Sequence, residues 1–74
     1  MFELSVSCYE KGVAHTLVSN SYSEAQSDLS AIAKLQSTQN PGNVQVSDDI
    51  VTVRADNGKI LMVAQIAPLA GSAA

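Results

Sequence analysis

Residues 50–66 read IVTVRADNGKILMVAQI, two apolar segments joined by a short polar stretch. Within that stretch Asn57 and Gly58 are the favoured pair for a two-residue type I′ turn between antiparallel strands. Such a turn places Ala55, Val53 and Val51 opposite Ile60, Met62 and Ala64, on one face together with Ile66. The other face carries Ile50, Thr52, Arg54, Leu61, Val63 and Gln65 and is half apolar. The hairpin therefore predicts a sheet that is covered on both sides.

Residues 2–18 have the pattern of a second hairpin. Phe2, Leu4, Val6 and Cys8 alternate with polar residues, as in a half-buried strand, and residues 13–18 form the returning strand. A three-residue loop over 10–12 places Cys8 opposite Ala14 and turns Ala14, Thr16 and Val18 inward. A two-residue turn over 11–12 places Cys8 opposite His15 and turns Val13, His15 and Leu17 inward. Because glycine ends the loop, we favour the first register, which sends His15 outward.

A helix is predicted between the two hairpins. Ser21 and Glu24 have the spacing of a capping box, in which the Ser21 hydroxyl accepts from Glu24 and the Glu24 carboxylate reaches back to Ser21. From Tyr22 to about Ser37 an apolar stripe of helical period follows. Its members are Tyr22, Ala25, Leu29, Ile32, Ala33 and Leu35. Pro41 and Gly42 end the helix, and a short strand over residues 44–47 precedes a turn at Asp48 and Asp49.

This order of elements predicts an α+β fold. A single antiparallel sheet of four to five strands with one helix packed on one face, in the order β-β-α-β-β-β, is the simplest architecture that matches one helical stripe to one inner sheet face. Residues 1–66 form the domain, and residues 67–74 are expected to be a flexible C-terminal tail because they are small and weakly patterned.

Composition excludes several classes of function. The chain has 74 residues and a formal net charge of −3, with only Lys11, Lys34, Arg54 and Lys59 as scattered cations, so nucleic acid is not an expected partner. Its apolar runs are too short to cross a membrane. Cys8 is the only cysteine, which rules out an internal disulfide and a zinc site of paired thiolates. With no secretory pattern at the N-terminus, cytoplasmic residence is expected.

Few residues offer chemistry. Cys8 and His15 would meet across the first hairpin in the less favoured register, as an activated thiol requires, yet no oxyanion site accompanies them. Asp48 and Asp49 are neighbours whose side chains point to opposite sides of an extended chain, so a turn explains them better than a cation site. We predict no catalytic, cofactor-binding or metal-binding residues. The chain is not expected to be an enzyme.

The surplus sheet face predicts a protein partner. Ile50, Leu61 and Val63, with Leu17 if the two hairpins are neighbours, would form a contiguous aliphatic patch, unless the C-terminal tail covers it with Leu69. The predicted partner-binding residues are Ile50, Arg54, Leu61, Val63, Leu17 and Tyr9. We expect a small cytoplasmic, non-catalytic protein-interaction module that acts through a sheet face or edge as a homodimer. The alternatives are an inhibitor, of the kind that phages or mobile elements encode, that sterically blocks a host or defence complex, and a minor enzyme or ligand carrier.

Overall fold

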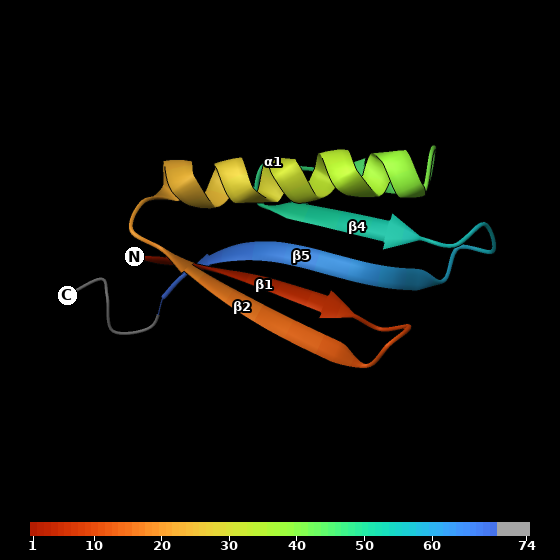
Figure 1. Ribbon diagram of the computed structural model, residues 1–74, viewed down its shortest axis with the longest axis horizontal. Helices are drawn as coiled ribbons and strands as arrows, with labels where there is room; N and C mark the ends of the chain where they lie inside the picture. The colour runs from red at the N-terminus through yellow and green to blue at the C-terminus, as the bar shows by residue number, and fades with distance from the viewer. Residues whose placement is uncertain (70–74) are drawn as a thin grey trace.

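Five strands form one antiparallel sheet in the order β2-β1-β5-β4-β3, and one helix lies across one face of it (Figure 1). The computed structural model describes residues 1–69. The elements are β1 (Phe2–Cys8), β2 (Val13–Ser19), α1 (Tyr22–Gln39), β3 (Val44–Val46), β4 (Ile50–Arg54) and β5 (Ile60–Pro68). The predicted α+β fold, its helix and its strand order along the chain are confirmed.

The core lies between α1 and the middle of the sheet. Ala25, Leu29 and Ala33 follow one another at four-residue intervals on α1 and are buried, because residues at this spacing share one helix face. The sheet contributes buried side chains from β1, β4 and β5. These are Leu4, Val51, Val53, Met62, Ala64 and Ile66. Leu35, which the predicted stripe includes, is 56% exposed instead, because it lies to the side of this face.

Local hydrogen bonds explain where α1 begins and ends. The Ser21 hydroxyl accepts from the backbone N–H of Glu24 at 3.2 Å, as predicted. The Glu24 carboxylate accepts from the N–H of Asn20 at 3.1 Å, one residue before the predicted partner, Ser21. At the other end the helix continues two residues past the predicted Ser37 to Gln39, and the N–H of Asn40 donates to the carbonyl of Gln36. Pro41 then prevents continuation.

The hairpin between β4 and β5 closes with a three-residue loop rather than the predicted type I′ turn. Gly58 has a φ of 88°, whereas Asn57 keeps a negative φ, so the left-handed pair that a type I′ turn needs is not formed. The N–H of Gly58 donates to the carbonyl of Ala55, and the N–H of Ala55 donates to the carbonyl of Lys59. This arrangement is a type I turn followed by a left-handed glycine.

A bulge in β5 offsets this longer loop. Arg54 lies opposite Ile60, but Val53 lies opposite Met62, so Leu61 is an extra residue in β5. The predicted pairing of Ala55 with Ile60 is therefore wrong. The predicted pairs Val53 with Met62 and Val51 with Ala64 are confirmed, because the extra loop residue and the extra strand residue cancel.

The first hairpin adopts neither predicted loop. Residues 9–12 form a four-residue loop, with Gly12 at a φ of 65°, and Cys8 lies opposite Val13. His15 lies opposite Val6, on the side of the sheet that α1 covers, so the favoured prediction that His15 faces outward is wrong. The helix-side residues of β2 are Val13, His15, Leu17 and Ser19. The reason is that one additional loop residue exchanges the two faces of the returning strand.

Strand β5 extends beyond the predicted domain boundary. Pro68 lies opposite Phe2, and the N–H of Leu69 donates to the carbonyl of Met1 at 3.1 Å, so residues 67–69 follow the start of β1 instead of leaving the sheet. The predicted flexible tail began at residue 67. Its remaining part, residues 70–74, lies outside the described residues.

Candidate interaction surface

Three of the predicted partner-binding residues lie on the sheet face that points away from α1. Ile50 is opposite Gln65, Val63 is opposite Thr52, and Arg54 is opposite Ile60. Ile50, Val63 and Arg54 are each half-buried. The Arg54 guanidinium donates to the carbonyl of Gly58 at 3.1 Å and so is held against its own hairpin loop.

Leu61 and Leu17 do not join this group. Leu61, the bulge residue, packs against the core. Leu17 is on the α1 side of β2, where it is 50% exposed. The structure therefore does not assemble the contiguous aliphatic patch of Ile50, Leu61, Val63 and Leu17 on one face.

The outer face of β1, the second strand of the sheet, is polar. Strand β1, which lies between β2 and β5, turns Glu3, Ser5 and Ser7 to this side, because Leu4 and Val6 between them point toward α1. The Ser5 hydroxyl donates to the Glu3 carboxylate at 3.1 Å. This row of polar side chains on β1 separates the few outward-facing aliphatic residues of β2 from those of β4 and β5.

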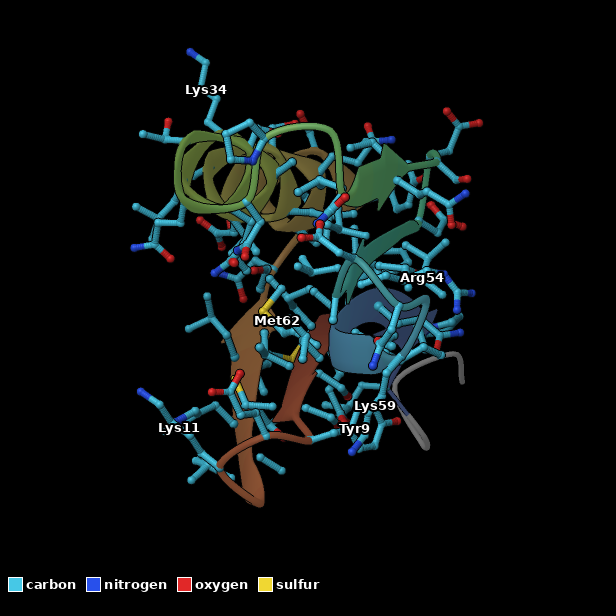
Figure 2. The ribbon with its side chains drawn as sticks, turned by 90° about the vertical axis from the view of Figure 1, so that its right-hand side faces the viewer. Tyr9, Lys11, Lys34, Arg54, Lys59 and Met62 are labelled. Carbon is cyan, nitrogen blue, oxygen red and sulfur yellow. The ribbon has the colours of Figure 1, made fainter. Side chains whose placement is uncertain are left out.

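Tyr9 lies in the loop between β1 and β2. Its ring side chain is 60% exposed, and its N–H donates to the carbonyl of Leu61 at 2.8 Å. Tyr9, Glu10, Lys59, Ile60 and Leu61 line a small groove of about 200 Å³ where the two hairpin loops meet. The end view in Figure 2 shows Tyr9 and Lys59 near each other at this end of the sheet.

The most exposed element of regular structure is β2. It is an edge strand that pairs with β1, and every one of its residues except Ser19 is exposed. Three of these exposed residues have large aliphatic side chains. The exposed fractions are 40% for Val13, 50% for Leu17 and 47% for Val18. In the described residues no other strand pairs with β2, so one side of its backbone is left without a strand partner.

Sequence reasoning missed Val13 and Val18 as surface residues, although a signal was present. Residues 13–19 read VAHTLVS and contain no Asp, Glu, Lys or Arg. Natural edge strands usually carry such charges, or a proline or a bulge, to prevent pairing with another chain. A seven-residue strand rich in valine, threonine and leucine without these features is open to strand addition.

The opposite edge of the sheet is protected. Strand β3 has three residues, and Asp48 and Asp49 lie one residue beyond it, after Ser47, in the turn before β4. The Tyr22 hydroxyl donates to the Asp49 carboxylate, which ties this turn to the start of α1. That hydrogen bond, together with desolvation and the negative charges of Asp49 and Asp48, raises the pKa of Tyr22.

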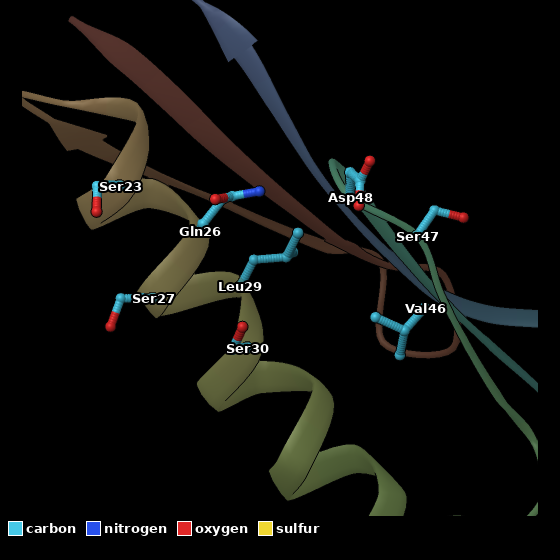
Figure 3. Close-up of a pocket in the computed structure, with 8 residues that line it drawn as sticks. All are labelled: Ser23, Gln26, Ser27, Leu29, Ser30, Val46, Ser47 and Asp48. Carbon is cyan, nitrogen blue, oxygen red and sulfur yellow. The ribbon is translucent and has the colours of Figure 1, made fainter.

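Two larger grooves lie on the α1 side of the sheet. The first, of about 440 Å³, separates the first half of α1 from β3 and the following turn (Figure 3). It is lined mainly by hydroxyl and amide groups, from Ser23, Gln26, Ser27, Ser30, Ser47 and Asp48, beside Leu29 and Val46. The second, of about 300 Å³, lies under the end of α1. It has an apolar floor of Cys8, Val53, Leu61 and Met62.

The structure brings Cys8 and His15 to the same face but does not pair them. Val13 is directly opposite Cys8, and His15 is opposite Val6, so Cys8 and His15 are diagonal neighbours. No hydrogen bond joins them among residues 1–69.

Within the same residues, no group of three or more His, Cys, Asp and Glu side chains is placed to hold a metal ion. The one helix described does not combine the length and the apolar character that crossing a membrane requires.

Comparisons with protein-family models, with curated proteins and with solved structures find no match to this chain. Its function is therefore inferred from the geometry of its own residues.

Proposed function

We propose that this chain is a small non-catalytic protein-interaction module that binds an extended protein segment along the free edge of β2. The observation that carries the proposal is the combination of a seven-residue, uncharged edge strand with aliphatic side chains exposed on both of its faces. Backbone groups of an edge strand pair with an added strand, and side chains on alternate positions supply specificity. A reducing compartment such as the cytoplasm suits the partly exposed free thiol of Cys8.

The asymmetry of the two sheet edges supports β2 rather than β3 as the binding edge. Strand β3 offers three residues, which allows few hydrogen bonds, and the carboxylates that follow it discourage pairing. Strand β2 offers seven residues. In Figure 1 β2 lies at the edge of the sheet that is farthest from α1, so an added strand would not meet the body of the helix.

The test places charges on the proposed edge. Replacing Leu17 and Val18 together by lysine puts one ammonium group on each face of β2, and both sites are about half exposed, so the fold should be retained. Val46→Lys is the matched control, because Val46 is a 60% exposed valine on the opposite edge strand. Circular dichroism verifies the fold of each variant.

Two readouts are taken together, namely mass by light scattering and the proteins that each immobilised variant retains from a cell lysate. The wild-type chain and Val46→Lys should self-associate or retain protein, and the Leu17→Lys, Val18→Lys double variant should lose this. A wild-type chain that is monomeric and retains nothing contradicts the proposal, as does equal association of the double variant. Retention of a nuclease or another defence complex through β2 would favour the steric inhibitor over the general interaction module.

A further inference from the structure

We infer that Asn57 is a site of spontaneous covalent modification, at which its side-chain amide is lost through ring closure with the backbone nitrogen of Gly58. The product at position 57 is aspartate or isoaspartate, and the hydrogen bonds of the loop between β4 and β5 control the rate. This inference does not depend on the proposed binding edge of β2.

The chain has four asparagines, and they differ in the residue that follows. The four pairs are Asn20-Ser21, Asn40-Pro41, Asn43-Val44 and Asn57-Gly58. Ring closure needs a backbone N–H on the following residue, and proline has none. Serine and the β-branched valine each place a Cβ beside the reacting nitrogen, whereas glycine does not. The pair in the β4–β5 loop is therefore the least hindered of the four.

Solvent has free access to this pair. Residues 56–59 are all exposed, and no other heavy atom lies within 4 Å of the place that a Cβ on Gly58 would take. Asn43, in contrast, is half-buried, and its side-chain nitrogen donates to the Asp56 carboxylate at 2.8 Å. The structure thus exposes the reactive pair and engages the amide of a competing one.

The folded loop activates the side-chain carbon of Asn57. Its carbonyl oxygen, Oδ1, accepts from the backbone N–H of Lys59 at 3.0 Å. Attack on the side-chain carbon moves negative charge onto Oδ1, and a donor that is already in place stabilises such a tetrahedral intermediate. The electrophile is therefore prepared in the native loop.

The same loop keeps the nucleophile engaged. The Gly58 N–H donates to the carbonyl of Ala55 at 2.9 Å, and the nitrogen must lose this proton before it can attack. The Arg54 guanidinium also holds Gly58, by donating to its carbonyl at 3.1 Å, while Asn43 holds Asp56 on the other side. Ring closure therefore requires a local opening of the loop.

The reaction needs only hydroxide and water as co-reactants. Hydroxide removes the Gly58 amide proton, the nitrogen bonds to Asn57 Cγ, and the bond from Cγ to Nδ2 breaks with release of ammonia, which takes its proton from water. Water then opens the cyclic imide at one of its two carbonyls. Either product changes the formal net charge from −3 to −4, because one carboxylate replaces one neutral amide.

The isoaspartate product also changes the main chain. It adds a methylene group to the loop, whose length, together with the bulge residue Leu61, sets the register of β4 on β5. The modification therefore acts on the hairpin that supplies most of the buried sheet residues.

The experiment follows the mass of each peptide of the full chain during incubation in mildly alkaline buffer. Replacement of an amide by an acid raises the mass, and fragmentation distinguishes aspartate from isoaspartate. The wild-type chain is incubated both folded and in urea. Asn57→Gln is the control for the site, because glutamine would have to close a larger ring, which forms more slowly.

Two further variants test the role of the loop. Arg54→Met removes the hydrogen bond to Gly58 and keeps an aliphatic side chain. Lys59→Met is the matched control, because it also removes one positive charge from this hairpin but keeps the backbone N–H that donates to Asn57. Circular dichroism verifies the fold of each variant.

Acid is expected first at position 57, faster in urea than in the folded chain, and absent there from Asn57→Gln. Arg54→Met should accelerate the reaction by about two- to tenfold, the change that loss of one hydrogen bond gives to an opening equilibrium. Lys59→Met should react at the rate of the wild-type chain.

Earlier formation of acid at Asn20 or Asn43 in the folded chain overturns the assignment of the site. A reaction at position 57 that is no faster in urea overturns control by the folded loop, and this comparison decides the point even if Arg54→Met does not fold. Equal rates for Arg54→Met and Lys59→Met overturn the role of the hydrogen bond from Arg54.

Discussion

Tyr22 links three parts of the molecule through one side chain. Its hydroxyl donates to Asp49 and accepts from the Gln26 amide at 3.0 Å, and its ring meets that of Phe2 edge-on with centroids 5.5 Å apart. The residue thus joins the first turn of α1 to β1 and to the turn before β4. No sequence pattern indicated this role, because the partners lie 20 and 27 positions away along the chain.

The first prediction concerns the titration of Tyr22. Its pKa is raised above the ordinary value of 10.0, chiefly because its hydroxyl donates to Asp49. A raised pKa in the folded state means that folding favours the protonated phenol, so this stabilisation is complete below pH 10 and is lost as the pH rises through the folded-state pKa. Asp49→Asn should lower the pKa of Tyr22.

The measurement is the ultraviolet absorbance of tyrosinate against pH. A Tyr9→Phe background leaves Tyr22 as the one tyrosine, since the chain has two. Asp56→Asn is the matched control, because Asp56 accepts from Asn43 and not from Tyr22. An unchanged pKa of Tyr22 in Asp49→Asn would show that the hydrogen bond is not formed in solution.

At the scale of elements, α1 is held by few large side chains. Of its three buried residues two are alanines, which leaves Leu29, 3% exposed, as the only large one. A long surface helix gains most of its stability from packing of such a face rather than from its own propensity. Loss of Leu29 should therefore weaken the helix–sheet contact more than any other single truncation in α1.

The second prediction follows directly. Leu29→Ala should lower the free energy of unfolding by about 2 to 5 kcal/mol, through lost burial and a cavity. Leu35→Ala, at a 56% exposed leucine of the same helix, should change it by no more than about 0.5 kcal/mol. Urea unfolding at one fixed protein concentration measures both. Similar losses for the two variants would mean that α1 packs on the sheet through a different face.

At the scale of the whole molecule, any self-association through β2 would be coupled to stability. The chain has 74 residues, and domains of this size bury a small core, so binding between folded copies would add a large fraction to their stability. The third prediction is that the midpoint of thermal unfolding rises with the concentration of the wild-type chain. The same series for the Leu17→Lys, Val18→Lys double variant should be flat, whereas Val46→Lys should behave as wild type. A wild-type midpoint independent of concentration would contradict a dimer of folded copies.

Much of this fold follows from local pattern. The Ser21 cap and Pro41 set the ends of α1 to within two residues, because both act on backbone hydrogen bonds beside them. The alternation in residues 50–66 predicted that Val53 pairs with Met62. The structure has this pair although the loop is one residue longer than predicted, because the extra residue in the loop is offset by the bulge residue in β5. Such signals are short in range, and a single chain carries them without reference to the rest of the molecule.

The candidate site depended instead on how distant parts of the chain meet. Periodicity tells which residues of β2 share a face, but one extra residue in the loop before it exchanged the faces and moved His15 and Leu17 to the side of α1. Pairing of β1 with β5 is a contact between the two ends of the described chain, and it left β2 at an edge. Alternation is a property of neighbours, whereas strand order results from the packing of all the elements together. For that reason the free edge of β2 becomes visible in the folded molecule and not in its residues alone.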